Sequence, residues 1–196
     1  MKKISGFTLV EIIMVIILLG VLGILGTVGL NSAVSSDRGM YERQLESAIR
    51  YAQNYAMSHF TYTTVVFSST GSSPSCSLSG NSPYYSGYAV CACNGAAASP
   101  ALEPLTNPLA QTTNNFYVSM NYGISYSYSD PGISANYIAF NSAGQPGTLS
   151  SSTSPCAVTT AYKPLTSVTQ ISFGSLSNQS FYIYPDTGLV SYNGKL

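Results

Sequence analysis

The sequence predicts an α+β protein in which a long N-terminal helix packs on an antiparallel β-sheet head with long loops. Three observations predict this fold class. Residues 12–30 form an almost purely apolar run. Residues 41–56 repeat apolar side chains at helical spacing. From Thr61 onward, short strand-like runs alternate with turns rich in Gly, Ser, Asn and Pro.

The apolar run from Ile12 to Leu30 contains no charged side chain and approaches the ~20 residues that a membrane-spanning helix needs. Lys2 and Lys3 are the only charges ahead of residue 11, so the positive-inside rule predicts a cytoplasmic N-terminus and an exported remainder. A cleaved secretory signal would have a shorter run followed by a small-residue site. The run therefore predicts a transmembrane helix.

Glu11 stands at the leading edge of this run, where a carboxylate is costly and by default marks a function. A local explanation also fits, because Thr8 and Glu11 have the spacing of a capping box and a first-turn carboxylate complements the helix dipole. Capping alone does not explain why the leader before it is so short.

Gly6-Phe7-Thr8-Leu9-Val10-Glu11 follows a short basic leader and precedes the apolar run. This arrangement resembles the class III signal of type IV pilins and type II secretion pseudopilins. The resemblance implies cleavage after Gly6 by a prepilin peptidase, and methylation of the new N-terminus at Phe7. It also implies that the Glu11 carboxylate pairs with the terminal amine of a neighbouring subunit during assembly.

The resemblance implies a pilin fold in four segments: a cleaved leader (1–6), a transmembrane and assembly helix (7–30), an amphipathic helix (31–60) and a disulfide-stapled β head (61–196). The partners it implies are the prepilin peptidase, other pilin or pseudopilin subunits, an inner-membrane assembly platform, and the lipid bilayer before assembly. The implied location is the bacterial inner membrane, single-pass with a periplasmic head, and then the filament.

The subtype follows from a weaker resemblance. Residues 138–147 and 181–190 are similar to the ending of H-type minor pseudopilins and MSHA-type minor pilins. This similarity implies a minor subunit that primes assembly or lies at the filament tip.

The second half of the expected helix has one apolar stripe, at Tyr41, Leu45, Ala48, Ile49, Ala52, Tyr55 and Ala56. We expect this stripe to pack on the sheet of the same chain. Glycines at 20, 23, 26 and 29 each cost ~1 kcal/mol relative to Ala in a helix. Their spacing fits either a place where the helix melts or close helix packing.

Four cysteines, Cys76, Cys91, Cys93 and Cys156, predict disulfide bonds in an exported segment. A Cys91–Cys93 bridge would be strained within a strand, so Cys76 and Cys156 are each expected to join one of these two. Which joins which is left open. The spacing matches no common zinc site and no His lies nearby, so no metal or cofactor is expected.

Seven segments predict strands and three predict loops. The strands are Tyr62–Ser68, Tyr84–Cys93, Phe116–Tyr128, Asn136–Asn141, Val168–Gly174, Ser180–Tyr184 and Leu189–Tyr192. The loops are Ser69–Pro83, Asn94–Asn115 and Gly144–Pro155.

Charge and composition restrict the function. Charged residues make up only 7% of the chain, and residues 61–196 carry Lys163 and Lys195 against three acids, so nucleic acid is an unfavourable partner. The single imidazole, His59, lies at an expected helix end, where capping or solvent contact explains it better than general-base catalysis. A non-enzymatic structural subunit is therefore expected. The alternative is a pilus-borne adhesin or uptake factor that binds a surface, glycan or DNA through its polar loops.

Overall fold

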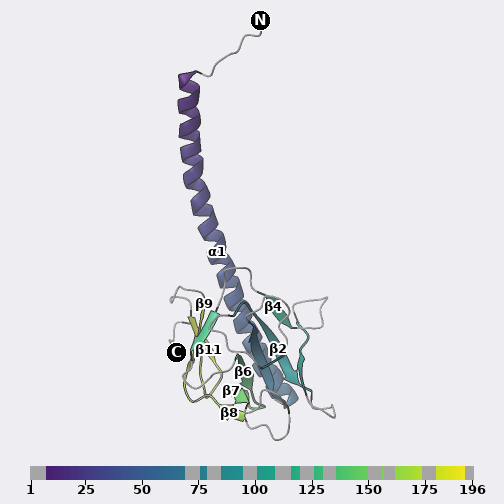
Figure 1. The fold of residues 1–196 in the computed structure, drawn as a ribbon. Helices are drawn as coiled ribbons and strands as arrows, with labels where there is room; N and C mark the ends of the chain where they lie inside the picture. Colours follow the sequence, from purple (N-terminus) through teal and green to yellow (C-terminus); the bar gives the residue numbers. More distant parts are fainter. Residues whose placement is uncertain are drawn as a thin grey trace. The chain divides into compact units, whose positions relative to one another are not determined.

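The computed structural model describes residues 8–68, 76–78, 85–94, 101–108, 116–119, 126–129, 136–149, 156, 162–173 and 180–192, without the side chains of residues 21–38, 117, 119, 126–129, 173, 181 and 192. The chain divides into two compact units, Met1–Tyr41 and Glu42–Leu196. The first contains the start of helix α1. The second, called here the β unit, contains the end of α1 and all the strands (Figure 1).

Helix α1 runs from Leu9 to His59 and has 51 residues. It stays helical through the segment of glycines at 20–29. In a helix each backbone N–H finds its acceptor four residues earlier in the same segment, so the hydrogen-bond ladder offsets the low propensity of glycine.

The expectation of a transmembrane half, and with it the inner-membrane location, is wrong by this structure. Among the residues that the structure describes, no helix is long and apolar enough to cross a membrane.

The fold-class prediction also needs correction for the head, which has two antiparallel sheets where one was expected. The first sheet has the strand order β3-β2-β1-β6-β7-β8, with β4 also paired to β2. Its strands are β1 (Thr63–Ser68), β2 (Gly87–Cys93), β3 (Leu102–Pro104), β4 (Tyr117–Ser119), β6 (Tyr137–Phe140), β7 (Pro146–Leu149) and β8 (Tyr162–Pro164).

The second sheet has the order β11-β10-β9-β5. Its strands are β5 (Tyr126–Ser129), β9 (Thr169–Phe173), β10 (Ser180–Ile183) and β11 (Val190–Tyr192). The single strand expected over Phe116–Tyr128 therefore becomes β4 in the first sheet and β5 in the second. The segments expected as loops contain β3 and β7, and β8 was not expected at all.

One face of the first sheet packs against the end of α1. Thr63 donates a hydrogen bond from its hydroxyl to the Ala52 carbonyl at 2.8 Å, which places the odd-numbered side chains of β1 on the helix side. The facing helix stripe is entirely buried and consists of Leu45, Ala48, Ile49, Ala52 and Ala56. Three of its members are alanines, whose small side chains let the helix backbone approach the sheet closely. The expected stripe therefore packs on its own sheet.

The opposite face of the same sheet is buried as well. The even-numbered position Val66 joins a cluster with Ala89, Cys91, Tyr137 and Ala139, covered by Leu78 and Leu149. The Tyr137 hydroxyl donates to the Leu149 carbonyl at 2.9 Å and accepts from the Leu149 amide at 3.1 Å, so this buried phenol is satisfied. Burial raises its pKa. Both faces of the central strands are therefore inside the protein.

Both disulfides are present, and the structure decides the open pairing: Cys76 joins Cys91, and Cys93 joins Cys156. Because side chains alternate along β2, Cys91 belongs to the buried cluster on the face away from the helix. Cys93, at the end of the strand, holds the distant residue 156. The bridges thus fasten two separate segments to one strand.

Gln53 joins the two sheets through its side-chain amide. Its Nε2 donates to the Gly144 carbonyl at 2.8 Å and to the Thr187 carbonyl at 2.8 Å. Gly144 lies in the turn between β6 and β7, and Gly188 follows Thr187 in the turn between β10 and β11. Both glycines have positive φ, 77° and 64°. A Cβ on Gly188 would lie 2.7 Å from Nε2 of Gln53, so this close approach requires glycine.

We predict that Gln53→Glu destabilises the β unit by about 2–4 kcal/mol, because a carboxylate cannot donate and would face two carbonyl oxygens. Asn54→Asp is the matched control, since it makes the same change of charge at an exposed neighbour. Urea unfolding of the full-length chain in a non-ionic detergent, followed by circular dichroism, measures both. Equal losses for the two variants would show that the bridge contributes nothing.

Peptide mapping without reduction should recover Cys76 linked to Cys91, and Cys93 linked to Cys156. Reduction should lower the stability of the β unit by ~2–4 kcal/mol for each bridge, because the unfolded chain regains the entropy of an open loop. Recovery of the crossed pairs, or of four free thiols in protein kept under oxidising conditions, would contradict this connectivity.

Candidate functional site

The described chain begins at a capping box that opens α1. The amide nitrogen of Glu11 lies 3.4 Å from the Thr8 hydroxyl, and Oε2 of Glu11 lies 3.4 Å from both the amide and the hydroxyl of Thr8. The reciprocal contacts follow the sequence spacing. They are longer than the usual 2.7–3.2 Å of a hydrogen bond, so the box holds Glu11 only weakly.

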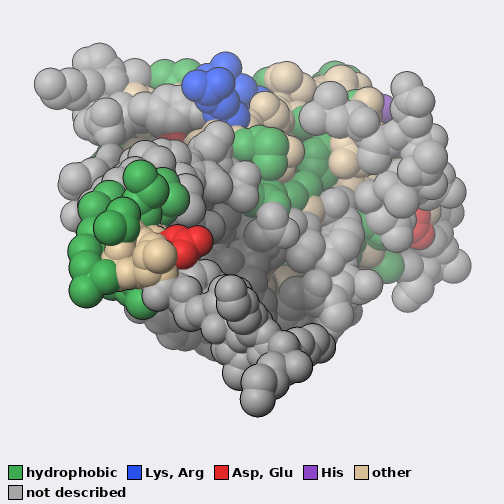
Figure 2. All heavy atoms as spheres, turned by 90° about the horizontal axis from the view of Figure 1, so that it is seen from above, with side chains coloured by type: hydrophobic (Ala, Val, Ile, Leu, Met, Phe, Trp, Pro, Cys, Tyr) green, Lys and Arg blue, Asp and Glu red, His purple; other side chains and the backbone are tan. Residues whose placement is uncertain are grey.

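Apolar side chains surround this helix start and face solvent. Leu9 is 74% exposed, Val10 67% and Leu19 64%, and every large apolar side chain between them is at least 48% exposed. Figure 2 shows these side chains gathered at the start of α1, with an acidic group at their edge. Isolated exposed apolar residues are ordinary, but a continuous set of this kind marks a surface that another molecule covers.

Of the residues that the sequence assigned to processing and assembly, the structure describes Glu11. Gly6 and Phe7, the cleavage and methylation positions, lie outside the described residues. Glu11 lies in the first turn of α1, among the exposed apolar side chains. Within the described part of the chain its carboxylate contacts Thr8 and no cation.

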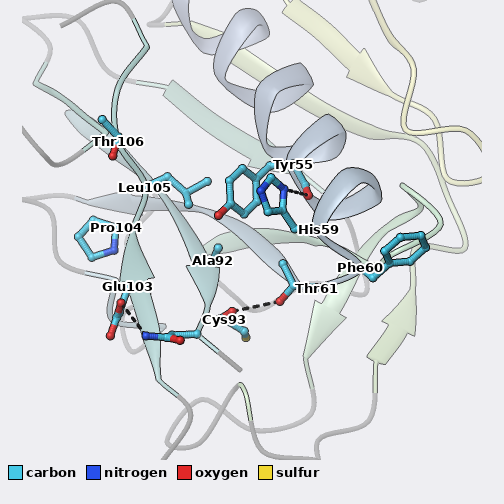
Figure 3. A pocket seen from close by; sticks show the side chains of 11 residues that line it. Tyr55, His59, Phe60, Thr61, Ala92, Cys93, Glu103, Pro104, Leu105 and Thr106 are labelled. Carbon is cyan, nitrogen blue, oxygen red and sulfur yellow. Dashed lines mark hydrogen bonds between the residues drawn. The ribbon is translucent and has the colours of Figure 1, made fainter. Parts of the chain in front are cut away.

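A second candidate site is a cleft at the other end of α1, called here the helix-end cleft. Its volume is about 520 Å³, and it lies between the last turn of the helix and strands β2 and β3 (Figure 3). Its described lining comprises Tyr55, His59, Phe60, Thr61, Ala92, Cys93, Asn94, Glu103, Pro104, Leu105 and Thr106. All of these belong to the β unit.

A row of aromatic rings leads along α1 to one wall of the cleft. Its members on the helix, Tyr51, Tyr55 and His59, are one helical turn apart. Phe116 stacks on Tyr51 at 5.5 Å between ring centroids, and Tyr51 lies 6.1 Å from Tyr55. Tyr55 in turn stacks on the His59 imidazole at 3.8 Å with the planes 6° apart. The Tyr51 hydroxyl also donates to the Thr106 carbonyl. The row braces the helix against the segment that follows β3.

His59 belongs to the last turn and takes part in closing it. Its Nδ1 lies 2.9 Å from the Ser58 hydroxyl and 3.3 Å from the Tyr55 carbonyl. This agrees with the capping role expected from the sequence. Among the described residues, no hydrogen bond uses Nε2, and none uses the Tyr55 hydroxyl.

Phe60 ends the helix in a backbone conformation that side chains rarely adopt. Its φ is 50°, and the Thr61 amide donates to the Ala56 carbonyl at 3.2 Å, the long-range bond of a Schellman ending. Glycine normally occupies this position, because a left-handed residue with a Cβ is strained. The Phe60 ring is nevertheless 83% exposed, so packing of the ring within the described chain does not offset the backbone strain.

Glu103 supplies the one acidic group of the described lining. The Asn94 amide donates to its Oε2 at 3.1 Å, which fixes the carboxylate, while Oε1 has no partner among the described residues. The floor is held by Thr61, whose hydroxyl donates to the Cys93 carbonyl at 3.1 Å. Figure 3 shows Glu103 and Phe60 at opposite ends of the lining.

Sequence reasoning assigned no role to Glu103 or Phe60. Glu103 was one of three scattered acids in the head, and Phe60 was only the last residue of an expected helix. A bulky aromatic at a helix ending, where glycine is usual, was the available signal. The part of the chain that the structure describes contains no group of three or more His, Cys, Asp or Glu able to hold a metal.

Comparison of the chain with protein-family models, with curated proteins and with solved structures finds no match.

Proposed function

We propose that this protein is a structural subunit, of the minor type, of a filament related to type IV pili or type II secretion pseudopili. In this proposal a prepilin peptidase cuts after Gly6 and methylates Phe7. The start of α1 then packs among the equivalent helices of neighbouring subunits. The observation that carries the proposal is the set of exposed apolar side chains from Leu9 to Leu19, which begins within the prepilin-like motif.

Burial supplies the driving force in this proposal. Covering a Leu, Ile or Val side chain contributes about 1.5–3 kcal/mol, so a helix start with this many exposed apolar groups gains most by packing against copies of itself. Such a core has a low dielectric, in which an unpaired Glu11 carboxylate would be costly. The methylated amine of a neighbouring Phe7 would neutralise it and set the axial register between subunits.

The alternative, a filament-borne binding protein, is favoured by a different feature. The helix-end cleft combines aromatic rings and a carboxylate, as small-ligand sites do. The two functions are compatible, because the apolar helix start and the cleft belong to different units of the chain.

We predict that the mature protein begins at Phe7 and carries one added methyl group. Intact-mass measurement should show the loss of residues 1–6 and the gain of that methyl group. Gly6→Ala should leave the leader attached, because the peptidase must approach the backbone closely at this position. An N-terminus at Met1 in the wild type, in cells that process a known prepilin, would reject the proposed family.

Three substitutions at the start of α1 separate pairing from capping. Glu11→Ala removes both the charge and the cap, Glu11→Gln keeps a capping-box side chain without the charge, and Thr8→Ala weakens the cap but keeps the charge. Pairing predicts that both Glu11 variants are lost from the filament, while Thr8→Ala is incorporated normally. Each variant should still be cleaved after Gly6.

The measurement is the number of subunits in sheared filaments, with each variant expressed beside the wild type. If Glu11→Gln is incorporated as well as the wild type while Glu11→Ala and Thr8→Ala are both reduced, Glu11 acts as a helix cap worth ~1 kcal/mol. That result would remove the pairing mechanism and leave the family assignment to the processing experiment.

A further inference from the structure

We propose that the helix-end cleft binds the cationic side chain of a lysine or arginine presented by a partner polypeptide. The proposal rests on the β unit alone, so it does not depend on whether the protein assembles into a filament. Four features of the cleft carry it: its electrostatic sign, its aromatic wall, the strained exposed Phe60 and the adjoining sheet edge.

The electrostatic sign of the cleft is negative. Glu103 contributes a full charge, with Oε1 unpaired among the described residues. The last turn of α1 lines the same cleft, and the final carbonyls of a helix carry about half a negative charge. No Lys or Arg occurs among the described lining residues. A cation entering the cleft therefore meets two attractive groups, and no Lys or Arg among the described lining residues.

The aromatic groups suit an alkylammonium or guanidinium head with an apolar stem. Tyr55 and His59 form one stacked unit in the wall, and Phe60 presents an almost fully exposed ring. Cations are attracted to the faces of aromatic rings within about 6 Å, and the methylene stems of Lys and Arg pack on apolar surface. Figure 3 shows Tyr55 and His59 along the helix side, Glu103 across from them, and Phe60 at the far end of the lining.

The strain at Phe60 points to a ligand contact. A left-handed backbone at a residue with a Cβ is strained and tends to occur where function requires it. The 83% exposure of Phe60 leaves most of the ring available. Glycine would satisfy the helix ending better, so the aromatic side chain itself is what this position supplies.

The partner is a polypeptide because the cleft opens beside an edge of the first sheet. β3 is the end strand of that sheet in the described part of the chain, and Glu103 and Pro104 belong to both β3 and the cleft lining. An extended segment can lie along such an edge while its alternate side chains enter adjacent pockets. A free amine would use the charge of the cleft but not the edge.

The test is an NMR titration of the full-length chain in a non-ionic detergent. The probe is acetyl-Ala-Ala-Lys-Ala-Ala-amide, and its neutral control carries norleucine in place of lysine. We expect shifts at Thr61, Cys93 and Asn94 with the lysine peptide, and binding about ten-fold tighter than with norleucine. Equal binding of the two peptides, or no shifts at these residues, would overturn the proposal.

Butylamine separates the two sources of the cation. The lysine peptide should bind at least about ten-fold more tightly than butylamine, which carries the same charge without a backbone. Equal affinities would refute the polypeptide partner and leave an amine site.

Two variants test the residues. Glu103→Gln should weaken binding of the lysine peptide about ten-fold, while Asp186→Asn, the same change at an exposed carboxylate outside the described lining, should leave it unchanged. Phe60→Gly should weaken binding about three-fold and raise the unfolding midpoint, because it relieves the strained ending. Unchanged affinity in both Glu103→Gln and Phe60→Gly would refute the site, and the raised midpoint excludes misfolding as the cause of weaker binding.

Discussion

The β unit depends on one side-chain amide, that of Gln53 on the last turns of α1. Its two N–H bonds reach carbonyls in two turns, one from each sheet. The second sheet has no strand paired to the first within the described chain, so this bridge does what a shared hydrogen-bond ladder would otherwise do. It also explains the two left-handed glycines, because each turn must bring its backbone against the helix.

The apolar side chains of α1 are buried at its end and exposed at its start. In the β unit, the alanine-rich stripe is fully buried against the sheet, and the buried sheet faces carry few charges. At the start of α1, side chains of the same apolar kind are half to three-quarters exposed. A low charge content thus accompanies two different surfaces in one chain: a sheet buried on both faces, and a helix start whose described apolar side chains are exposed.

Much of the β unit could be predicted where the pattern was local. Helical spacing identified the stripe, and strain excluded a Cys91–Cys93 bridge, but only three-dimensional placement could choose between the remaining pairings. The alternation of apolar and polar residues along the strands was weak, because both faces of β1 and β2 are buried. Pro146 and its neighbouring glycines indicated a loop, whereas β7 begins at that proline. The helix-end cleft was out of reach, because it joins a helix ending to residues some forty positions away.

In the proposed filament, capping and pairing at Glu11 would be successive states of one carboxylate. In the described chain, both contacts to Thr8 use Oε2 and both are 3.4 Å long, so they hold the carboxylate loosely and leave Oε1 open. Contacts this long cost little to exchange for a charged amine, which would add a direct attraction between opposite charges to the hydrogen bond. The cap can therefore satisfy the helix start before assembly without obstructing the ion pair proposed for the filament core.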